Sequence, residues 1–138
     1  MSVVHFGSES EFICISLPSS FTTEGWAQAR VDIAVNGFTA QIAPWIEASD
    51  LNLFTKQLRG VFETLQGEAE FSPVERQFTF KISAHTGGHI QVTGEAWSQA
   101  TFENKLSFEL QLDQSYLSQP LCDLEELMTK SISDGTTA

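Results

Sequence analysis

Residues 105–117 constrain the fold more than any other part of this chain. Apolar and polar residues alternate strictly along the first part of this segment, which is typical of a strand with one face in the core and one in solvent. The inward residues are Leu106, Phe108, Leu110 and Leu112. Asp113 and Ser115 follow, and their short side chains can accept hydrogen bonds from the free amides of a helix's first turn. The segment therefore predicts a half-buried strand that leads directly into a helix.

Further strands are predicted by alternation elsewhere, at 3–6, 11–17, 26–35, 38–42, 68–71, 77–84 and 89–96, with the last strand at 102–112. Asn36-Gly37 is a strong hairpin signal, since both residues tolerate the positive φ of a type I′ turn. Thr86-Gly87-Gly88 predicts a second tight turn. Strands joined by tight turns pair antiparallel.

Two amphipathic helices are predicted by apolar residues at helical spacing. The first opens at Ser49 and stops at Gly67. Pro120 cannot lie inside a regular helix, so we expect a separate turn at 115–118 and a closing helix from near Gln119. The apolar stripes comprise Leu51, Phe54, Leu58, Val61, Phe62 and Leu65, and then Leu117, Leu121, Leu124, Leu127 and Met128.

This order of elements predicts a single α+β domain over residues 1–138, with a polar tail at 133–138. We expect a curved, mainly antiparallel sheet of about seven to eight strands, with two helices packed on one face as a two-layer sandwich. Phe78, Phe80, Ile82 and the inward residues of 105–112 should share one core.

The charge of the chain is strongly acidic, with 18 acidic against 7 basic side chains and a net charge of −11. Binding to a nucleic acid backbone requires clustered Lys and Arg, and the basic residues here are scattered singly. The acidic excess either keeps the protein in solution or attracts a basic protein partner.

The cellular setting is predicted to be the cytoplasm. Residues 1–7 carry no basic segment of a signal peptide, and no stretch approaches the ~20 apolar residues of a membrane span. Cys14 and Cys122 lie on different predicted elements and fit two reduced, buried thiols, with a disulfide as the alternative.

Catalytic and metal-binding patterns are weak. His85 and His89 flank a Gly-Gly turn without an evident third ligand, so a surface turn is favoured over a metal site. No Ser or Cys lies in a nucleophile motif. We expect no enzyme activity and no cofactor. Trp26, Trp45 and Trp97 either belong to the rim of the core, which is favoured, or form an exposed aromatic platform.

The segments 31–40, 45–58, 88–90 and 113–117 together resemble the WapI-type immunity proteins of bacterial polymorphic toxin systems. The resemblance implies a small cytoplasmic antidote that binds and silences a cognate toxin domain, which in that family is often a nuclease. It implies no catalytic residue, and no binding residue can be transferred, because the family's toxin-contacting positions vary.

Our first hypothesis is an immunity-type inhibitor, monomer or homodimer, that occludes a basic toxin domain sterically and electrostatically. A small ligand-binding or scaffold module with an apolar pocket on a curved sheet is the alternative, and an unrecognised enzyme is a third. The acidic residues expected to contact the partner are Glu68, Glu70, Asp123, Glu125 and Glu126.

Overall fold

The computed structural model describes residues 2–18, 21–22 and 24–137, with side chains described as far as Thr129. This part of the chain forms strands and two α-helices, so the predicted α+β class is confirmed. Their order is β1 (Ser2–Gly7), β2 (Phe12–Leu17), β3 (Trp26–Gln28), β4 (Arg30–Val35), β5 (Phe38–Ile42), β6 (Trp45–Glu47), α1 (Ala48–Thr64), β7 (Glu68–Phe71), β8 (Phe78–His85), β9 (His89–Trp97), β10 (Lys105–Asp113) and α2 (Ser118–Thr137).

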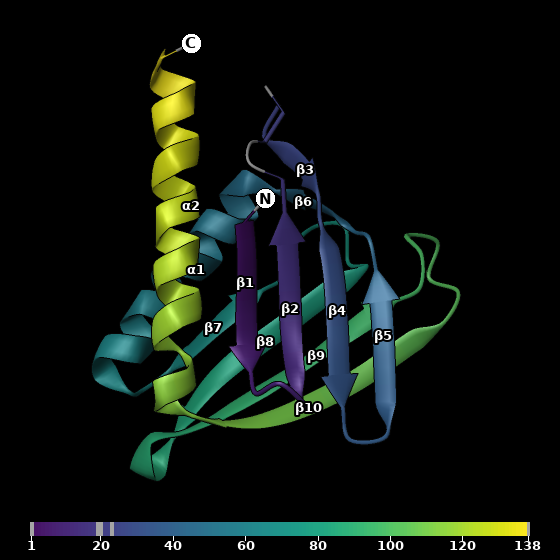
Figure 1. The fold of residues 1–138 in the computed structure, drawn as a ribbon, viewed down its shortest axis with the longest axis vertical. Coiled ribbons are helices and arrows are strands. Elements are labelled where there is room, and N and C mark those ends of the chain that lie inside the picture. Colours follow the sequence, from purple (N-terminus) through teal and green to yellow (C-terminus); the bar gives the residue numbers. More distant parts are fainter. Residues whose placement is uncertain (1, 19–20, 23, 138) are drawn as a thin grey trace.

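The strands form three antiparallel sheets, whereas the sequence predicted one curved sheet. The N-terminal sheet has the strand order β1-β2-β4-β5, and the C-terminal sheet has the order β10-β9-β8-β7. Strands β3 and β6 form a separate two-stranded ribbon. Figure 1 shows the strands of the N-terminal sheet crossing in front of those of the C-terminal sheet. The apolar face of each large sheet is therefore covered mainly by the other sheet.

The long strand predicted at 26–35 is divided into β3 and β4 at Ala29. The amide of Ala29 donates to the carbonyl of Pro44 over 2.9 Å, outside the regular strand pairing. Pro44 has no amide to donate, and β5 ends before it, at Ile42, as the sequence predicted. The short strand β6 that follows was not predicted, because three residues are too few to show alternation.

The predicted hairpin turns are confirmed. Asn36-Gly37 joins β4 to β5, with Gly37 at φ 85°. Asn36 is not among the described non-glycine residues with a positive φ, so the turn is present but does not have the type I′ geometry. Gly7 ends β1 at φ 112°, and a Cβ there would lie 2.3 Å from the carbonyl oxygen of Glu11. Only glycine fits this close approach of the two strands.

The inward face of the C-terminal sheet is confirmed, and its register explains one glycine. Phe80, Gly94 and Phe108 are paired across β8, β9 and β10. A Cβ on Gly94 would lie 2.5 Å from the tip of the Phe108 ring and 2.8 Å from Cβ of Phe80. Gly94 therefore makes room for two aromatic side chains. Phe108 and Phe80 are buried, while Leu106 at the end of β10 is only partly buried.

The two sheets and α1 meet at three phenylalanines. Phe54 of α1 lies 4.9 Å from Phe80 of the C-terminal sheet and 6.4 Å from Phe6 of the N-terminal sheet, between ring centroids. Phe6 and Phe80 are 5.8 Å apart. All three pairs are edge-to-face, the geometry that the ring quadrupoles favour.

The helices lie together where the two large sheets have their β1 and β7 edges. Helix α1 packs against β7 and α2, and α2 packs against β1 (Figure 1). Asp113 accepts a hydrogen bond from the amide of Ser115 over 3.1 Å and caps a short turn at Gln114–Tyr116. The predicted turn before the closing helix is thereby confirmed. The helix continues to Thr137, through the predicted tail, and Ala138 lies outside the described residues.

The two cysteines are free thiols on separate elements. Cys14 is half-buried on the outer side of β2, where burial raises its pKa. Cys122 is exposed on α2, so the expectation that both thiols are buried is wrong for Cys122. Neither described helix is apolar enough over its length to cross a membrane.

Phe80→Ala should lower the free energy of unfolding by ~3–5 kcal/mol, because it empties the space where both sheets and α1 meet. Phe38→Ala is the matched control. Phe38 is 64% exposed, and its truncation should change the stability by less than about 0.5 kcal/mol. Urea unfolding at neutral pH measures both. Equal effects of the two changes would contradict the assigned core.

Candidate partner-binding surfaces

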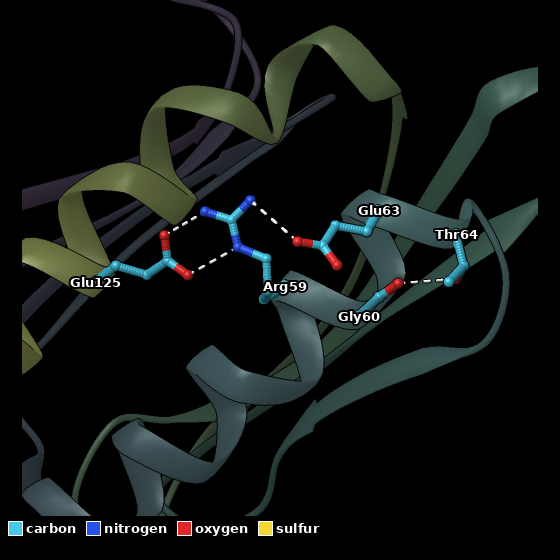
Figure 2. A network of polar contacts seen from close by, with 5 residues as sticks. All are labelled: Arg59, Gly60, Glu63, Thr64 and Glu125. Carbon is cyan, nitrogen blue, oxygen red and sulfur yellow. Dashed lines mark hydrogen bonds and ion pairs between the residues drawn. The ribbon is translucent and has the colours of Figure 1, made fainter.

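Glu125 is held within the protein by an arginine of the other helix (Figure 2). Arg59 of α1 donates from Nε to Oε2 of Glu125 over 2.8 Å and makes a second hydrogen bond from Nη2 to Oε1. The same guanidinium lies 3.7 Å from Glu63, one helical turn further along α1. Glu125 therefore joins α1 to α2, and part of its charge is already balanced.

The electrostatics of this pair follow from its hydrogen bonds. The guanidinium of Arg59 donates to Glu125 and holds the pKa of that carboxyl below its usual range. Both side chains remain more than a third exposed, so solvent screens the attraction. The pair orients the two helices more than it stabilises them.

Glu68 and Glu70 lie on the outer side of β7, the edge strand of the C-terminal sheet. Glu68 accepts a hydrogen bond from Ser83 Oγ over 2.9 Å and lies 3.2 Å from Lys81 Nζ. The Ser83 hydrogen bond, with Lys81, lowers the pKa of Glu68. Glu70 is exposed and is opposite Lys81 in the strand register. Of the two, Glu70 has the freer carboxylate.

Asp123 and Glu126 lie elsewhere, on the side of α2 that faces β1. Together with Ser2, Val3 and Leu127 they line a small hollow of about 150 Å³. Asp123 accepts a hydrogen bond from Gln119 over 3.0 Å. The five acidic residues singled out in the sequence are thus distributed over three places: the outer side of β7, the α1–α2 contact and the β1 side of α2.

The outer face of the C-terminal sheet carries a ladder of polar side chains. Gln91 donates to Glu109, and Gln111 hydrogen-bonds to His89 on the next strand. At the far end, Lys105 lies 3.4 Å from Glu95. The alternation in 105–112 predicted that this face is polar, but cross-strand partners depend on a register that the sequence does not reveal.

His85 and His89 pair across the turn between β8 and β9, with ring centroids 6.4 Å apart. Nε2 of His85 lies 3.1 Å from Oε1 of Gln91, and Nε2 of His89 is hydrogen-bonded to Gln111. One nitrogen of each ring is therefore engaged by an amide. No group of three potential metal ligands occurs among the described residues.

The three tryptophans have different surroundings. Trp97 packs edge-on against Phe102 at 5.1 Å, with Lys105 Nζ 5.3 Å from its ring centroid. Trp26 and Trp45 lie on the β3–β6 ribbon, where Trp26 is half-buried and Trp45 is 48% exposed. For Trp45 the exposed-platform interpretation, which the sequence did not favour, describes the structure better.

The outward direction of these two indoles follows from the strand register. Ala27 and Ile46 are paired, and both are buried against the core. Trp26 is paired with Glu47, and Trp45 with Gln28, so both indoles lie on the opposite face as diagonal neighbours. A hollow of about 500 Å³ at this face, the tryptophan hollow, is lined by Thr22, Glu24, Trp26, Trp45 and Glu75.

Comparison with known proteins shows to which family the chain belongs. The model of the Immunity protein WapI-like family matches residues 5–130, which is nearly the whole chain. The chain belongs to this family. The resemblance seen in the sequence is thereby confirmed. No curated protein matches.

Solved structures also match this WapI-like chain, at low identity. The crystal structures of Trypanosoma brucei MRP1/MRP2 match with a TM-score of 0.54 and 9% identity, over 100% of this chain and 87% of that one. A CdiA-CT/CdiI toxin and immunity complex from Enterobacter cloacae matches with a TM-score of 0.49 and 13% identity, over 88% of this chain and 99% of that one. The first likeness supports the overall architecture alone.

Glu125→Gln should destabilise the WapI-like domain at pH 7, and by less at about pH 3. A carboxyl whose folded pKa is lowered stabilises the fold above its ordinary pKa, about 4.3, and this contribution is lost as the pH falls through the folded value. Urea midpoints at both pH values measure it, with the same change in an Arg59→Gln background as control. A loss that is independent of pH, or that persists without Arg59, would contradict the role of this ion pair.

The histidine turn should bind no stoichiometric metal, since two imidazoles without a third ligand hold zinc weakly. Untagged protein incubated with zinc, nickel or copper and then desalted should retain far less than one equivalent by elemental analysis. A full equivalent of metal that disappears in His85→Ala would show that this prediction is wrong.

Proposed function

We propose that this protein is an immunity protein that binds a cognate toxin domain and blocks it by steric and electrostatic occlusion. Membership of the WapI-like immunity family carries the proposal. The protein then acts by binding alone, without a cofactor, in the cytoplasm and as a monomer or homodimer. A single protein partner is its functional ligand.

The charge of the chain supports a basic partner. With a net charge of −11, the protein repels acidic surfaces and attracts basic ones at long range. A toxin that cleaves nucleic acid must present Lys and Arg to phosphates, and an acidic inhibitor complements such a surface. A nuclease domain is therefore the toxin class that fits best.

Of the five acidic residues, Glu70, Asp123 and Glu126 have no ion-pair partner among the residues whose side chains are described. Glu68 and Glu125 have cationic neighbours within the chain, so a partner gains less from approaching them. Charges at an exposed rim accelerate association more than they slow dissociation. We therefore propose that these three residues accelerate the approach of the toxin. Glu68 and Glu125 instead form ion pairs within the protein, next to the surfaces on which these three residues lie.

The alternative of a small-ligand module needs an apolar pocket on the inner side of a sheet. Side chains from both sheets and α1 fill the middle of that space, around Phe6, Phe54 and Phe80. The inner faces thus contribute to stability, and the outer faces remain for binding.

The association rate with the toxin domain encoded beside this gene should depend strongly on charge and salt. We expect a rate well above the ~10⁵–10⁶ M⁻¹s⁻¹ of unsteered pairs, falling as the Debye length shrinks from about 10 Å at 0.1 M to about 3 Å at 1 M salt. Stopped-flow or surface-based kinetics measure it. Failure of the toxin domain to bind, or to be neutralised on co-expression, would contradict the proposed function.

Two charge reversals show which surface the toxin approaches. Glu70→Lys alters the C-terminal sheet, and the pair Asp123→Lys/Glu126→Lys alters α2. The variant at the contacting surface should associate about tenfold more slowly, with dissociation nearly unchanged. Glu103→Lys is the control for net charge, since Glu103 is exposed in the loop before β10. Equal rates in all variants would remove these carboxylates from the mechanism.

A further inference from the structure

The tryptophan hollow combines two kinds of group that recognise the same ligand. Trp26 and Trp45 contribute indole faces, and Glu24 and Glu75 contribute carboxylates. No lysine or arginine is among the lining residues, and within the described residues neither glutamate has an ion-pair partner. Indole faces attract cations, and carboxylates attract them more strongly.

The walls of the hollow are positioned by backbone hydrogen bonds. The amide of Trp26 donates to Thr22 Oγ1 over 3.1 Å, and the amide of Thr22 donates to the carbonyl of Trp26 over 2.8 Å. The carbonyl of Gly25 accepts from the amide of Ala48 over 2.7 Å, which attaches this turn to the start of α1. Trp45 is held by its pairing with Gln28. The backbone that carries both indoles is therefore fixed before a partner arrives.

Exposure of a large indole has an energetic cost that a purely structural residue would avoid. Trp45 keeps 48% of its surface in solvent, although the same strand buries Ile46 almost completely. The alternation of the strand thus directs the larger side chain outward and the smaller one inward. Tryptophan is among the residue types enriched at the positions that dominate binding in protein interfaces.

We propose that the tryptophan hollow receives an arginine side chain of the toxin partner, an inference that rests on the proposed function. A guanidinium is planar, so it stacks on an indole while its N–H groups donate to a neighbouring carboxylate. A lysine ammonium is more strongly hydrated and cannot stack in this way. The volume of about 500 Å³ accommodates the guanidinium and its alkyl stem.

The first test uses a probe that requires no toxin. N-acetylarginine amide is titrated into the intact protein, and the three indole N–H signals are followed by NMR. Trp26 and Trp45 should shift saturably, with a Kd on the order of millimolar for an isolated side chain, while Trp97 serves as an internal control. Glu24→Gln/Glu75→Gln should weaken binding by roughly threefold or more, and Phe38→Ala should leave it unchanged.

Two further probes decide the chemistry. The citrulline analogue has the same shape without the charge, and the lysine analogue has the charge without the plane. Both should bind more weakly than the arginine probe. Absence of a shift with arginine, or an equal shift with citrulline or lysine, would overturn the proposal.

The second test uses the toxin domain. Trp45→Leu should weaken its binding by roughly tenfold, whereas Phe38→Ala should not. If the arginine probe binds but Trp45→Leu binds the toxin like the unmodified protein, the hollow lies outside the interface and this inference fails while the proposed function stands. If the unmodified protein does not bind the toxin domain, the proposed function fails, and the inference fails with it.

Discussion

The contact between Phe6, Phe54 and Phe80 is the constraint on which the rest of the structure depends. These rings come from the N-terminal sheet, α1 and the C-terminal sheet, and they lie within 6.4 Å of one another between centroids. Each element is amphipathic and would be unstable alone, because one of its faces needs an apolar partner. Packing at this point satisfies all three at once.

The same contact decides where binding can occur. Because the apolar faces of the two large sheets pack toward one another, the outer faces remain for a partner. On the C-terminal sheet that face is a ladder of amide, imidazole and carboxylate groups, with Gln91 bonded to Glu109. The β3–β6 ribbon differs, since its outer face carries two indoles. At the ribbon a partner can contact carboxylates and aromatic rings at the same place.

Local patterns in the sequence predict the elements well, because alternation and turn chemistry act over a few residues. Residues 105–112, the Asn36-Gly37 turn and the cap at Asp113 all appear in the structure as expected. The separation into two facing sheets could not be predicted in this way. The two large sheets are separated along the chain by β6 and α1, and nothing local shows that β7 starts a new sheet instead of pairing with the first. The break at Ala29, where an amide bonds to Pro44, separates only the β3–β6 ribbon from the N-terminal sheet.

The candidate binding residues were harder to predict, because their availability depends on tertiary neighbours. Nothing local to Glu125 indicates that Arg59, 66 positions away in the sequence, reaches it. Likewise, Trp45 stands beside a proline in a segment too short to show alternation. Its exposure becomes evident only from the pairing of Ala27 with Ile46.

Charge and shape have different roles in the binding of a partner by this protein. Among the described residues, the ion pairs engage Arg30, Arg59, Lys81 and Lys105, and most of the 18 acidic residues have no such partner. An excess spread so widely accelerates the approach of any basic protein but cannot select one. Selection requires groups in a fixed arrangement, where a wrong partner leaves a carboxylate or an indole face without its complement. On this protein Trp26 and Trp45, fixed as diagonal neighbours by the strand register with Glu24 and Glu75 lining the same hollow, meet that requirement better than the scattered carboxylates of β7 and α2.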